Sequence, residues 1–482
     1  MTFNSFEFLV FYPIVAALYF LLPKKMKWPM LLIASYYFYI FYQAELIFLI
    51  LGTTLISWIA SNVIERTESK ALRKTCLALT LIACLGVLFF YKYFNFLSGS
   101  IASLLGMDST VILNLVLPVG ISFYTFQTLS YVIDVYRGDV KTEKNFFFYA
   151  LFVSFFPQLV AGPIERPGNL IVQLREANRW DKDNAIKGAK HMIVGFFKKI
   201  CVADMLSIYV NQIYNNVAEA TAIGVIIATV MFSVQIYCDF SGYTDIATGC
   251  ARIMGIRLMK NFDHPYLSTT VKEFWSRWHI SLSSWFKDYL YIPLGGNRCG
   301  KARACFNVFI VFLVSGLWHG AAWTFVLWGA LHGVYQIVGT LTVKHRNEAL
   351  GKIGLTENSI AVVLVRRTFV FALVCFSWLF FRANSISDAF TLIKTLFVTG
   401  WDVGLSETLN IMKLDTVGVL MSILSVITLI MIDNILVYED SRDGSELLVK
   451  NGSFIYYVWM IIFAWAVLLS QDITSTFIYF QF

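Results

Sequence analysis

Long apolar runs separated by short polar connections make up most of this 482-residue chain. A helix that crosses the hydrocarbon core of a bilayer needs about 20 mostly apolar residues. The pattern therefore predicts an all-α, polytopic integral membrane protein. The candidate spans are residues 6–22, 30–44, 46–60, 76–93, 111–133, 146–163, 188–210, 221–238, 305–320, 322–341, 367–382, 415–437 and 453–470.

Proline and glycine interrupt the apolar run at 146–163. Phe156-Pro157 and Ala161-Gly162-Pro163 follow each other so closely that a straight helix is not expected. Non-helical backbone at membrane depth is tolerated only where protein or a water-filled cavity covers it. Residues 146–168 are therefore predicted to form a re-entrant or broken element that lines a cavity.

A different pattern appears at residues 273–289, where apolar and polar positions lie on separate stripes. Trp278, Leu282, Trp285 and Tyr289 recur at helical spacing. This stretch is predicted to be one amphipathic helix that lies at the membrane interface or dips into it. Nine lysines and arginines between residues 252 and 303 place the surrounding block on the cytosolic side.

Composition supports the membrane class. The chain is 58% hydrophobic and 14% charged, with a mean hydropathy of +0.66, whereas soluble domains carry about 25% charged residues. The net charge of +7 is assigned to alternate connections between spans and not to nucleic-acid binding. That alternation predicts an extracytoplasmic N-terminus. No internal repeat or long linker is visible, so residues 1–482 are predicted to form a single integral domain.

His319 is the most informative polar position. It lies in the stretch 306–333, which contains no Asp, Glu, Lys or Arg. An ionisable residue inside a span is by default a candidate functional group. One interpretation is a hydrogen-bonded histidine at a tight helix crossing, favoured by the G-x-x-x-G spacings at 316–320 and 329–333. The other is a neutral imidazole that acts as a general base. The residues alone favour neither.

Further polar candidates each allow a structural and a functional interpretation. His279 is either an interfacial side chain with its tip in water or a second active-site group. Glu165 and Arg166 form either a loop ion pair or a site for a polar ligand. Asp239, Ser241 and Asp245 mark the end of a span or orient a base, and Lys198 and Lys199 either extend to the membrane surface or contact an anionic donor.

Several chemical classes have no support in the sequence. The six histidines show no H-x-x-x-H or H-E-x-x-H spacing, and no cysteine pair assists them, so no metal site is expected. The eight cysteines are interpreted as small buried hydrophobes. Walker, G-x-G-x-x-G and G-x-S-x-G motifs are also missing, which argues against ATP hydrolysis and serine-hydrolase chemistry.

Five motifs together resemble the membrane-bound O-acyltransferase superfamily, and most closely its bacterial alginate O-acetylation branch. They are V-G-I-S-F-Y-T-F-Q at 119–127, G-P-I-E-R-P at 162–167, Y-C-D-F-S-G-Y-T-D at 237–245, the stretch F-W-S-R-W-H-I-S-L through G-G-N-R at 274–298, and S-G-L-W-H-G-A-A-W at 315–323. The resemblance covers nearly the whole chain. It implies a helical bundle around a central tunnel, with re-entrant and interfacial helices, in a bacterial cytoplasmic membrane, and a catalytic core near residues 111–341.

The resemblance also implies roles for individual residues. The family's membrane histidine falls on His319 and its second polar site residue on His279. Its Asp-containing motif falls on Asp239 and Asp245. Glu273 and Ser276 stand where the family pattern has Asp and Arg, so the chain departs from the pattern at these two positions. Candidate contacts to substrate or donor are Glu165, Arg166, Asp239, Ser241, Asp245, Trp278, Trp318, Asn297 and Arg298.

The reaction expected from the resemblance is acetyl transfer from a cytosolic thioester to a hydroxyl, with export to a cell-surface polysaccharide. The donor would be acetyl-CoA or an acyl-carrier protein held by the basic block 252–303, and no tightly bound cofactor is expected. His279 or tryptophan N–H groups would stabilise the oxyanion. A separate extracytoplasmic, esterase-like enzyme would complete transfer. Alternatives are acylation of teichoic acid, peptidoglycan or lipid, and a transporter that moves a polymer or lipid-linked sugar without chemistry.

Overall fold

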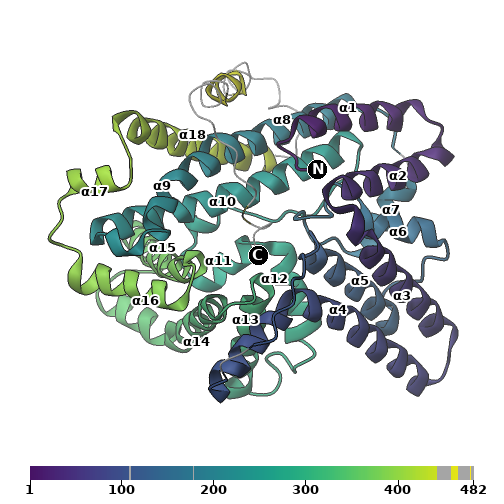
Figure 1. The fold of residues 1–482 in the computed structure, drawn as a ribbon, viewed down its shortest axis with the longest axis horizontal. Helices are drawn as coiled ribbons and strands as arrows, with labels where there is room; N and C mark the ends of the chain where they lie inside the picture. Colours follow the sequence, from purple (N-terminus) through teal and green to yellow (C-terminus); the bar gives the residue numbers. More distant parts are fainter. Residues whose placement is uncertain (108–109, 177, 442–456, 465–477, 479–482) are drawn as a thin grey trace. The chain divides into compact units, whose positions relative to one another are not determined.

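The computed structural model describes the chain except residues 108–109, 177, 442–456, 465–477 and 479–482 (Figure 1). The described residues are mostly helical and form no β-strand; one isolated antiparallel bridge pairs Phe262 with Trp278. The α-helices are Phe6–Leu21 (α1), Lys24–Gln43 (α2), Ile47–Arg66 (α3), Lys70–Leu105 (α4), Ile121–Arg137 (α5), Phe146–Ser154 (α6), Pro167–Glu176 (α7), Lys182–Phe196 (α8), Met205–Tyr214 (α9), Ala222–Ile253 (α10), Val271–Arg277 (α11), Ile280–Phe286 (α12), Lys301–His319 (α13), Trp323–Lys352 (α14), Ile360–Arg382 (α15), Ile386–Lys394 (α16), Leu405–Ile411 (α17) and Thr416–Ser441 (α18). Residues 457–464 are also helical.

The prediction of an all-α, polytopic membrane protein is confirmed. Six helices of the described chain are long and apolar enough to cross a membrane: residues 44–66, α4, α10, α13, α14 and α15. Each of them overlaps one of the predicted spans. The pair α17 and α18 also passes the same test together, with a bend of 88° between them. The predicted span at 453–470 lies largely outside the described residues.

Two predicted spans contain long stretches of non-helical backbone. The run at 111–133 becomes helical only at Ile121, because Pro118 and Gly120 precede the helix and Gly120 has a φ of 75°. In the run at 146–163, α6 ends at Ser154 and residues 155–166 have no α-helix. The predicted break is therefore present. Residues 148–165 are all buried, so protein covers the irregular backbone. Non-helical backbone at membrane depth needs such cover, because no water is present there to satisfy its polar groups.

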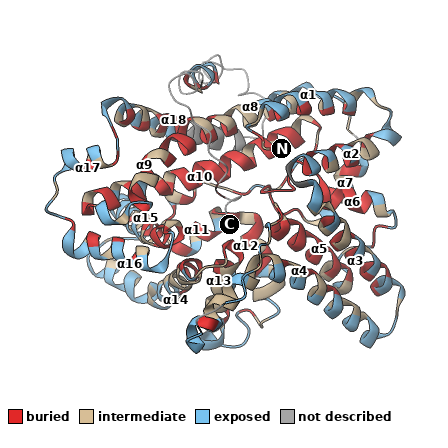
Figure 2. Cartoon of the chain, viewed as in Figure 1, coloured by how far each residue is buried: buried red, intermediate tan, exposed pale blue. Residues whose placement is uncertain are grey.

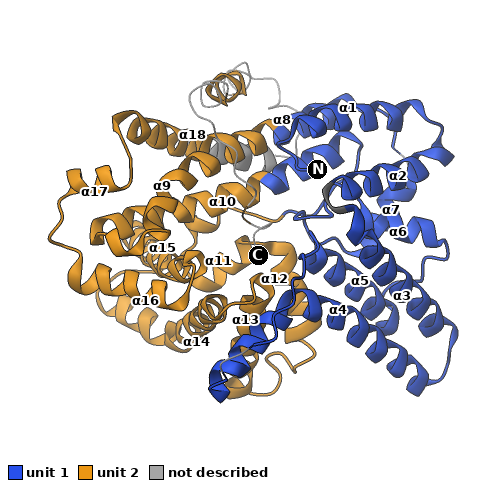
Figure 3. Ribbon diagram, in the orientation of Figure 1, with its two compact units in different colours: residues 1–192, 243–260 blue, residues 193–242, 261–482 orange. Residues whose placement is uncertain are grey.

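The chain divides into two compact units (Figure 3). The first contains residues 1–192 and 243–260, and the second contains residues 193–242 and 261–482. Helices α8 and α10 each contribute residues to both units. Figure 2 shows that buried residues are continuous along much of α10, whereas α1 and α4 expose many side chains. Exposed apolar side chains on α4 are expected for a helix that faces lipid.

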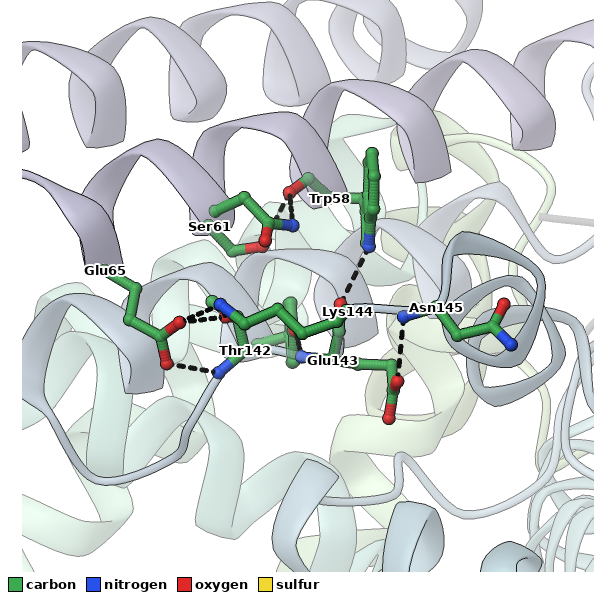
Figure 4. A network of polar contacts seen from close by, with 9 residues as sticks. Trp58, Ser61, Glu65, Thr142, Glu143, Lys144 and Asn145 are labelled. Atoms are coloured by element: carbon green, nitrogen blue, oxygen red, sulfur yellow. Dashed lines mark hydrogen bonds and ion pairs between the residues drawn. The ribbon is translucent and has the colours of Figure 1, made fainter.

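In the first unit, a polar network ties α3 to the loop before α6 (Figure 4). Glu65 accepts hydrogen bonds from the backbone N–H and hydroxyl of Thr142, and it pairs with Lys144. The Trp58 indole donates to the carbonyl oxygen of Glu143 at 2.8 Å. The Glu143 carboxylate in turn pairs with Arg175 on α7. This network fixes the polar connection that leads into the broken element.

In the second unit, α13 and α14 cross at very close range. A Cβ atom at Gly316 would lie 2.3 Å from the carbonyl oxygen of Phe325, and one at Gly329 would lie 2.3 Å from the carbonyl oxygen of Phe312. Only glycine fits such an approach of two backbones. The tight crossing predicted from the glycine spacing is therefore present. It sets the position of the residues that follow Gly316 on α13.

Candidate functional site

His319 is the last residue of α13, one helical turn after Gly316. Its side chain is buried, with a relative exposure of 4%. The imidazole packs against three aromatic rings, with centroid distances of 5.0 Å to Trp318, 5.0 Å to Trp328 and 5.5 Å to Phe381. Both interpretations drawn from the sequence therefore have a structural basis: His319 lies at a tight helix crossing, and it is buried among apolar rings.

His279 lies at the N-terminus of α12, where the chain bends sharply. The predicted single amphipathic helix over 273–289 is wrong, because α11 ends at Arg277 and α12 begins at Ile280. His279 adopts a left-handed conformation with a φ of 46°, which is costly for a residue with a Cβ atom. Asn261 holds this bend: its carbonyl oxygen accepts from the Ile280 N–H at 2.9 Å, and its side-chain oxygen accepts from Ser281.

The bend directs His279 into the interior of the second unit. Its side chain is fully buried, so the interpretation as an interfacial residue with its tip in water is wrong. The imidazole packs at 4.6 Å from Phe240 and 5.8 Å from Trp318, and its centroid lies 6.3 Å from that of His319. Burial lowers the pKa of His279 to about 3, which keeps the ring neutral at ordinary pH.

Trp278 and Trp318 belong to the same aromatic cluster, but they have different positions in it. Trp318 contacts both histidine rings. Trp278 is fully buried on the other side of the bend and packs on Phe274 and Trp378. The structure therefore brings together the four residues that the sequence predicted from two separate motifs.

Asp239 lies in a buried ionic cluster. Its carboxylate contacts the ammonium group of Lys199 at 2.7 Å and accepts from the backbone N–H of Ile478 at 2.6 Å. Lys199 also contacts Asp204 at 2.7 Å. The side chains of Lys199, Asp204 and Asp239 are at most 5% exposed. The suggestion that Lys199 extends to the membrane surface is therefore wrong.

The position of Lys199 follows from an irregular helix. Residues Phe197–Asp204, between α8 and α9, form a π-helix in which the chain is wider than in an α-helix. Lys198 is also buried, and its ammonium group lies 5.4 Å from the centre of the Tyr237 ring. The apolar run at 188–210 is thus helical as predicted, with two buried lysines at its irregular turn.

The remaining predicted residues are distributed over both units. Ser241 is buried on the part of α10 that belongs to the second unit, whereas Asp245 lies on the part that belongs to the first. Asn297 and Arg298 are exposed on the turn before α13 in the second unit. Glu165 and Arg166 belong to the first unit.

Glu165 is buried, and its main contacts are hydrogen bonds. Its carboxylate accepts from the backbone N–H of Met259 and from the side-chain amide of Asn169 at 2.7 Å. Burial raises the pKa of Glu165 to about 7, while these hydrogen bonds and the nearby Arg166 lower it. Glu165 therefore ties the broken element to the segment after α10 within the first unit.

Several residues around the histidines were not singled out by sequence reasoning. Phe240 lies inside the Y-C-D-F-S-G motif and Trp328 inside the apolar stretch after His319, yet both contact a histidine ring. Lys199 and Asp239 were both noted, but their contact and the second partner, Asp204, were not. The 40-residue separation of Lys199 and Asp239 and the π-helix leave no periodic signal that connects them.

These features define a multi-pass membrane protein with a buried histidine pair in an aromatic cluster. Comparison with known families is specific: residues 140–381 match the model of the membrane-bound O-acyltransferase family. The chain belongs to this family and is an O-acyltransferase.

Known relatives agree with the family assignment. A probable alginate O-acetylase from Pseudomonas putida is 35% identical over 100% of both chains. A peptidoglycan O-acetyltransferase from Helicobacter pylori is 33% identical over 82% of this chain and 79% of its own. A teichoic acid D-alanyltransferase from Bacillus subtilis is 30% identical over 46% of this chain and 58% of its own. The resemblance inferred from the motifs is confirmed, including the alginate branch.

Proposed function

We propose that this enzyme transfers an acetyl group from a thioester to a hydroxyl group, with His319 as the general base. The observation that carries the proposal is the burial of His319 and His279 in one aromatic cluster, with ring centroids 6.3 Å apart. An alcohol is too weak an acid to ionise before it reacts, so a base must remove its proton as the oxygen attacks. Such a base contributes about 10²–10⁴-fold to the rate.

The reaction balances without a metal or a redox partner. The hydroxyl oxygen forms a bond to the thioester carbonyl carbon while its proton moves to His319. The tetrahedral intermediate then expels the sulfur, the C–S bond breaks, and the thiolate takes the proton back from His319. The position of His319 at the C-terminal end of α13 supports this role, because the negative end of the helix dipole stabilises a ring that becomes positive for part of the cycle.

His279 is proposed to assist, either by positioning the substrate or by donating to the developing oxyanion. Trp318 contacts both histidines and is proposed to shape the space where the two substrates meet. The family motifs support contacts to the donor or acceptor at further positions. These are Glu165, Arg166, Asp239, Ser241, Asp245, Trp278, Asn297 and Arg298.

The proposed final acceptor is an exported polysaccharide, supported by the relative described as a probable alginate O-acetylase. The proposed donor is acetyl-CoA or an acyl-carrier thioester on the cytosolic side, supported by the basic residues between 252 and 303. We place residues 1–482 in the bacterial cytoplasmic membrane as one acyltransferase domain, with the core near 111–341 and the N-terminus outside. An extracytoplasmic partner would complete delivery to the polymer.

A second candidate acceptor is peptidoglycan, because the peptidoglycan O-acetyltransferase relative matches 82% of this chain. The D-alanyltransferase relative matches a smaller share and supports that reaction less. Mass spectrometry of the isolated polymers distinguishes the candidates, since the acetyl or alanyl ester is found on the exported polysaccharide, on the peptidoglycan glycan or on teichoic acid.

The test of the proposed function is the substitution His319→Ala. Acetate on the cell-surface polymer should fall by about 10²–10⁴-fold at unchanged protein abundance. The matched control is His345→Ala, since His345 is 81% exposed on α14 and should not matter. Purified protein with labelled acetyl-CoA should release free CoA in the presence of acceptor, whereas a transporter should release none. Unchanged acetylation by the His319 variant would remove this residue from the reaction.

A further inference from the structure

Trp328 and His332 lie one helical turn apart on α14 and are both fully buried. Residues four positions apart share one face of a helix. Their ring centroids are 5.0 Å apart, and Trp328 lies equally close to His319, also at 5.0 Å. Trp328 therefore contacts the proposed base on one side and a second imidazole on the other.

The hydrogen bond from Trp275 assigns the tautomer of His332. The indole N–H of Trp275 donates to Nδ1 of His332 at 3.2 Å. Tryptophan has a donor and no acceptor, so Nδ1 must be the acceptor in this contact. In a neutral imidazole only one nitrogen carries hydrogen, and here it is Nε2. Nε2 of His332 is therefore a hydrogen-bond donor.

The two donors of this pair, Nε2 of His332 and the indole nitrogen Nε1 of Trp328, both have no acceptor in the described part of the chain. A buried N–H group without an acceptor costs free energy, and native proteins rarely tolerate it without a reason. The rings of Phe274 and Phe312 pack on His332 and offer no conventional acceptor. Both N–H groups are therefore open to an acceptor on a bound molecule.

From this geometry we propose that Trp328 Nε1–H and His332 Nε2–H bind the carbonyl oxygen of the acyl group during transfer. This inference rests on the proposed function, since it assumes acyl transfer at His319. A thioester carbonyl oxygen accepts two hydrogen bonds, and it becomes negative when the hydroxyl adds to the carbonyl carbon. Fixed donors in a water-poor site stabilise that charge more than the ground state. Trp275 is a positioning residue in this scheme, because it acts through His332.

The first test removes each donor and keeps a flat ring. Trp328→Phe and His332→Phe should each lower kcat by about 10²-fold, with KM for the donor nearly unchanged. His332→Gln keeps an N–H donor and should recover part of the lost rate. Trp275→Phe releases Nδ1 and allows the other tautomer, so it should cause a smaller loss. Trp401→Phe is the control, because this indole is 60% exposed and donates to the Leu396 carbonyl.

A binding measurement separates recognition of the carbonyl from folding and from proton transfer. The probes are acetonyl-dethia-CoA, a ketone in which methylene replaces the sulfur, and S-ethyl-CoA, which has no carbonyl. Wild-type protein and the His319→Ala variant should both bind the ketone more tightly than the thioether. The Trp328→Phe and His332→Phe variants should lose that preference while still binding the thioether.

The outcomes distinguish the inference from the proposed function. If the two donor variants keep the wild-type kcat, or if wild-type protein shows no preference for the ketone, the donor pair does not hold the carbonyl and at most binds water. That result leaves the role of His319 intact. If His319→Ala retains full activity, the proposed function fails, whatever the donor variants show.

Discussion

The second unit contains two buried polar regions, one with histidines among aromatic rings and one with a cluster of charged side chains. Around His319 and His279, imidazoles pack among aromatic rings. Around Lys199, one ammonium group contacts two carboxylates at 2.7 Å each. The ionic cluster depends on close contact between opposite charges, because loss of the ammonium group would leave two carboxylates buried without this cation. In the histidine region, by contrast, burial disfavours the charged form of His279, so this ring is held neutral.

The largest expected effect is on the ionic cluster. Lys199→Met removes the cation and leaves Asp204 and Asp239 buried beside each other. Breaking a buried ion pair on one side typically costs about 3–5 kcal/mol. The variant should therefore show a strongly reduced abundance and a lower denaturation midpoint, whereas His319→Ala should abolish activity with a smaller loss of stability, from the cavity that it leaves.

A triple variant without charge at these three positions tests the same cluster. Lys199→Met combined with Asp204→Asn and Asp239→Asn removes all three charges and should recover a large part of the lost stability. If the single variant is as stable as the wild type, the cluster does not hold the fold together. Its burial would then need a functional explanation like that of the histidines.

Sequence reasoning located the histidine region better than the ionic cluster, for physical reasons. His319 and the glycines on either side of it lie in one continuous apolar run, where an isolated polar residue stands out. The bend at His279 could not be predicted, because the periodicity of this stretch fits a straight helix and the acceptor of its hydrogen bonds, Asn261, lies in a separate segment. The Lys199 cluster depends on a π-helix and on a contact with residue 478, and neither has a local pattern.

The six long spans were predictable because the cost of exposing backbone polar groups to lipid forces long apolar helices. Helix ends were less predictable. The start of α5 depends on Gly120, where a Cβ atom would lie 2.7 Å from the carbonyl oxygen of Leu159. Such close contacts join segments that are far apart in the sequence, so a single run of residues does not reveal them.

An intermediate effect is expected at the helix crossing that supports His319. Gly316→Ala places a methyl group against the carbonyl oxygen of Phe325, so α13 and α14 must separate. Overpacking of this kind costs about 1–3 kcal/mol. It should also lower acetyl transfer, because His319 follows one turn later. Denaturant midpoint and polymer acetylation are measured together.

The control for that crossing lies on its partner helix, α14. A Cβ atom added at Gly339 would meet no other atom within 4 Å, so Gly339→Ala should be neutral or stabilising by up to about 1 kcal/mol. If both alanine variants behave alike, the close approach at Gly316 does not position the histidine region. The histidine region would then not be held by close packing, and its difference from the Lys199 cluster, which is held by charge, would be smaller.

The smallest expected effect is on the pH dependence of stability, and it comes from the histidine region. Because burial lowers the pKa of His279 from 6.5 to about 3, the folded protein disfavours the charged ring. The stability contributed by this group is fully present above about pH 6.5 and is lost progressively as the pH falls toward 3. Between about pH 7 and 8, His279 should not affect stability or activity through its charge.

His279→Phe removes the titrating ring, so the decrease in denaturant midpoint from pH 7 to pH 5 should be shallower than in the wild type. Equal decreases in both proteins would show that His279 is not held neutral by its aromatic surroundings, and the electrostatic contrast with the Lys199 cluster would lose its basis.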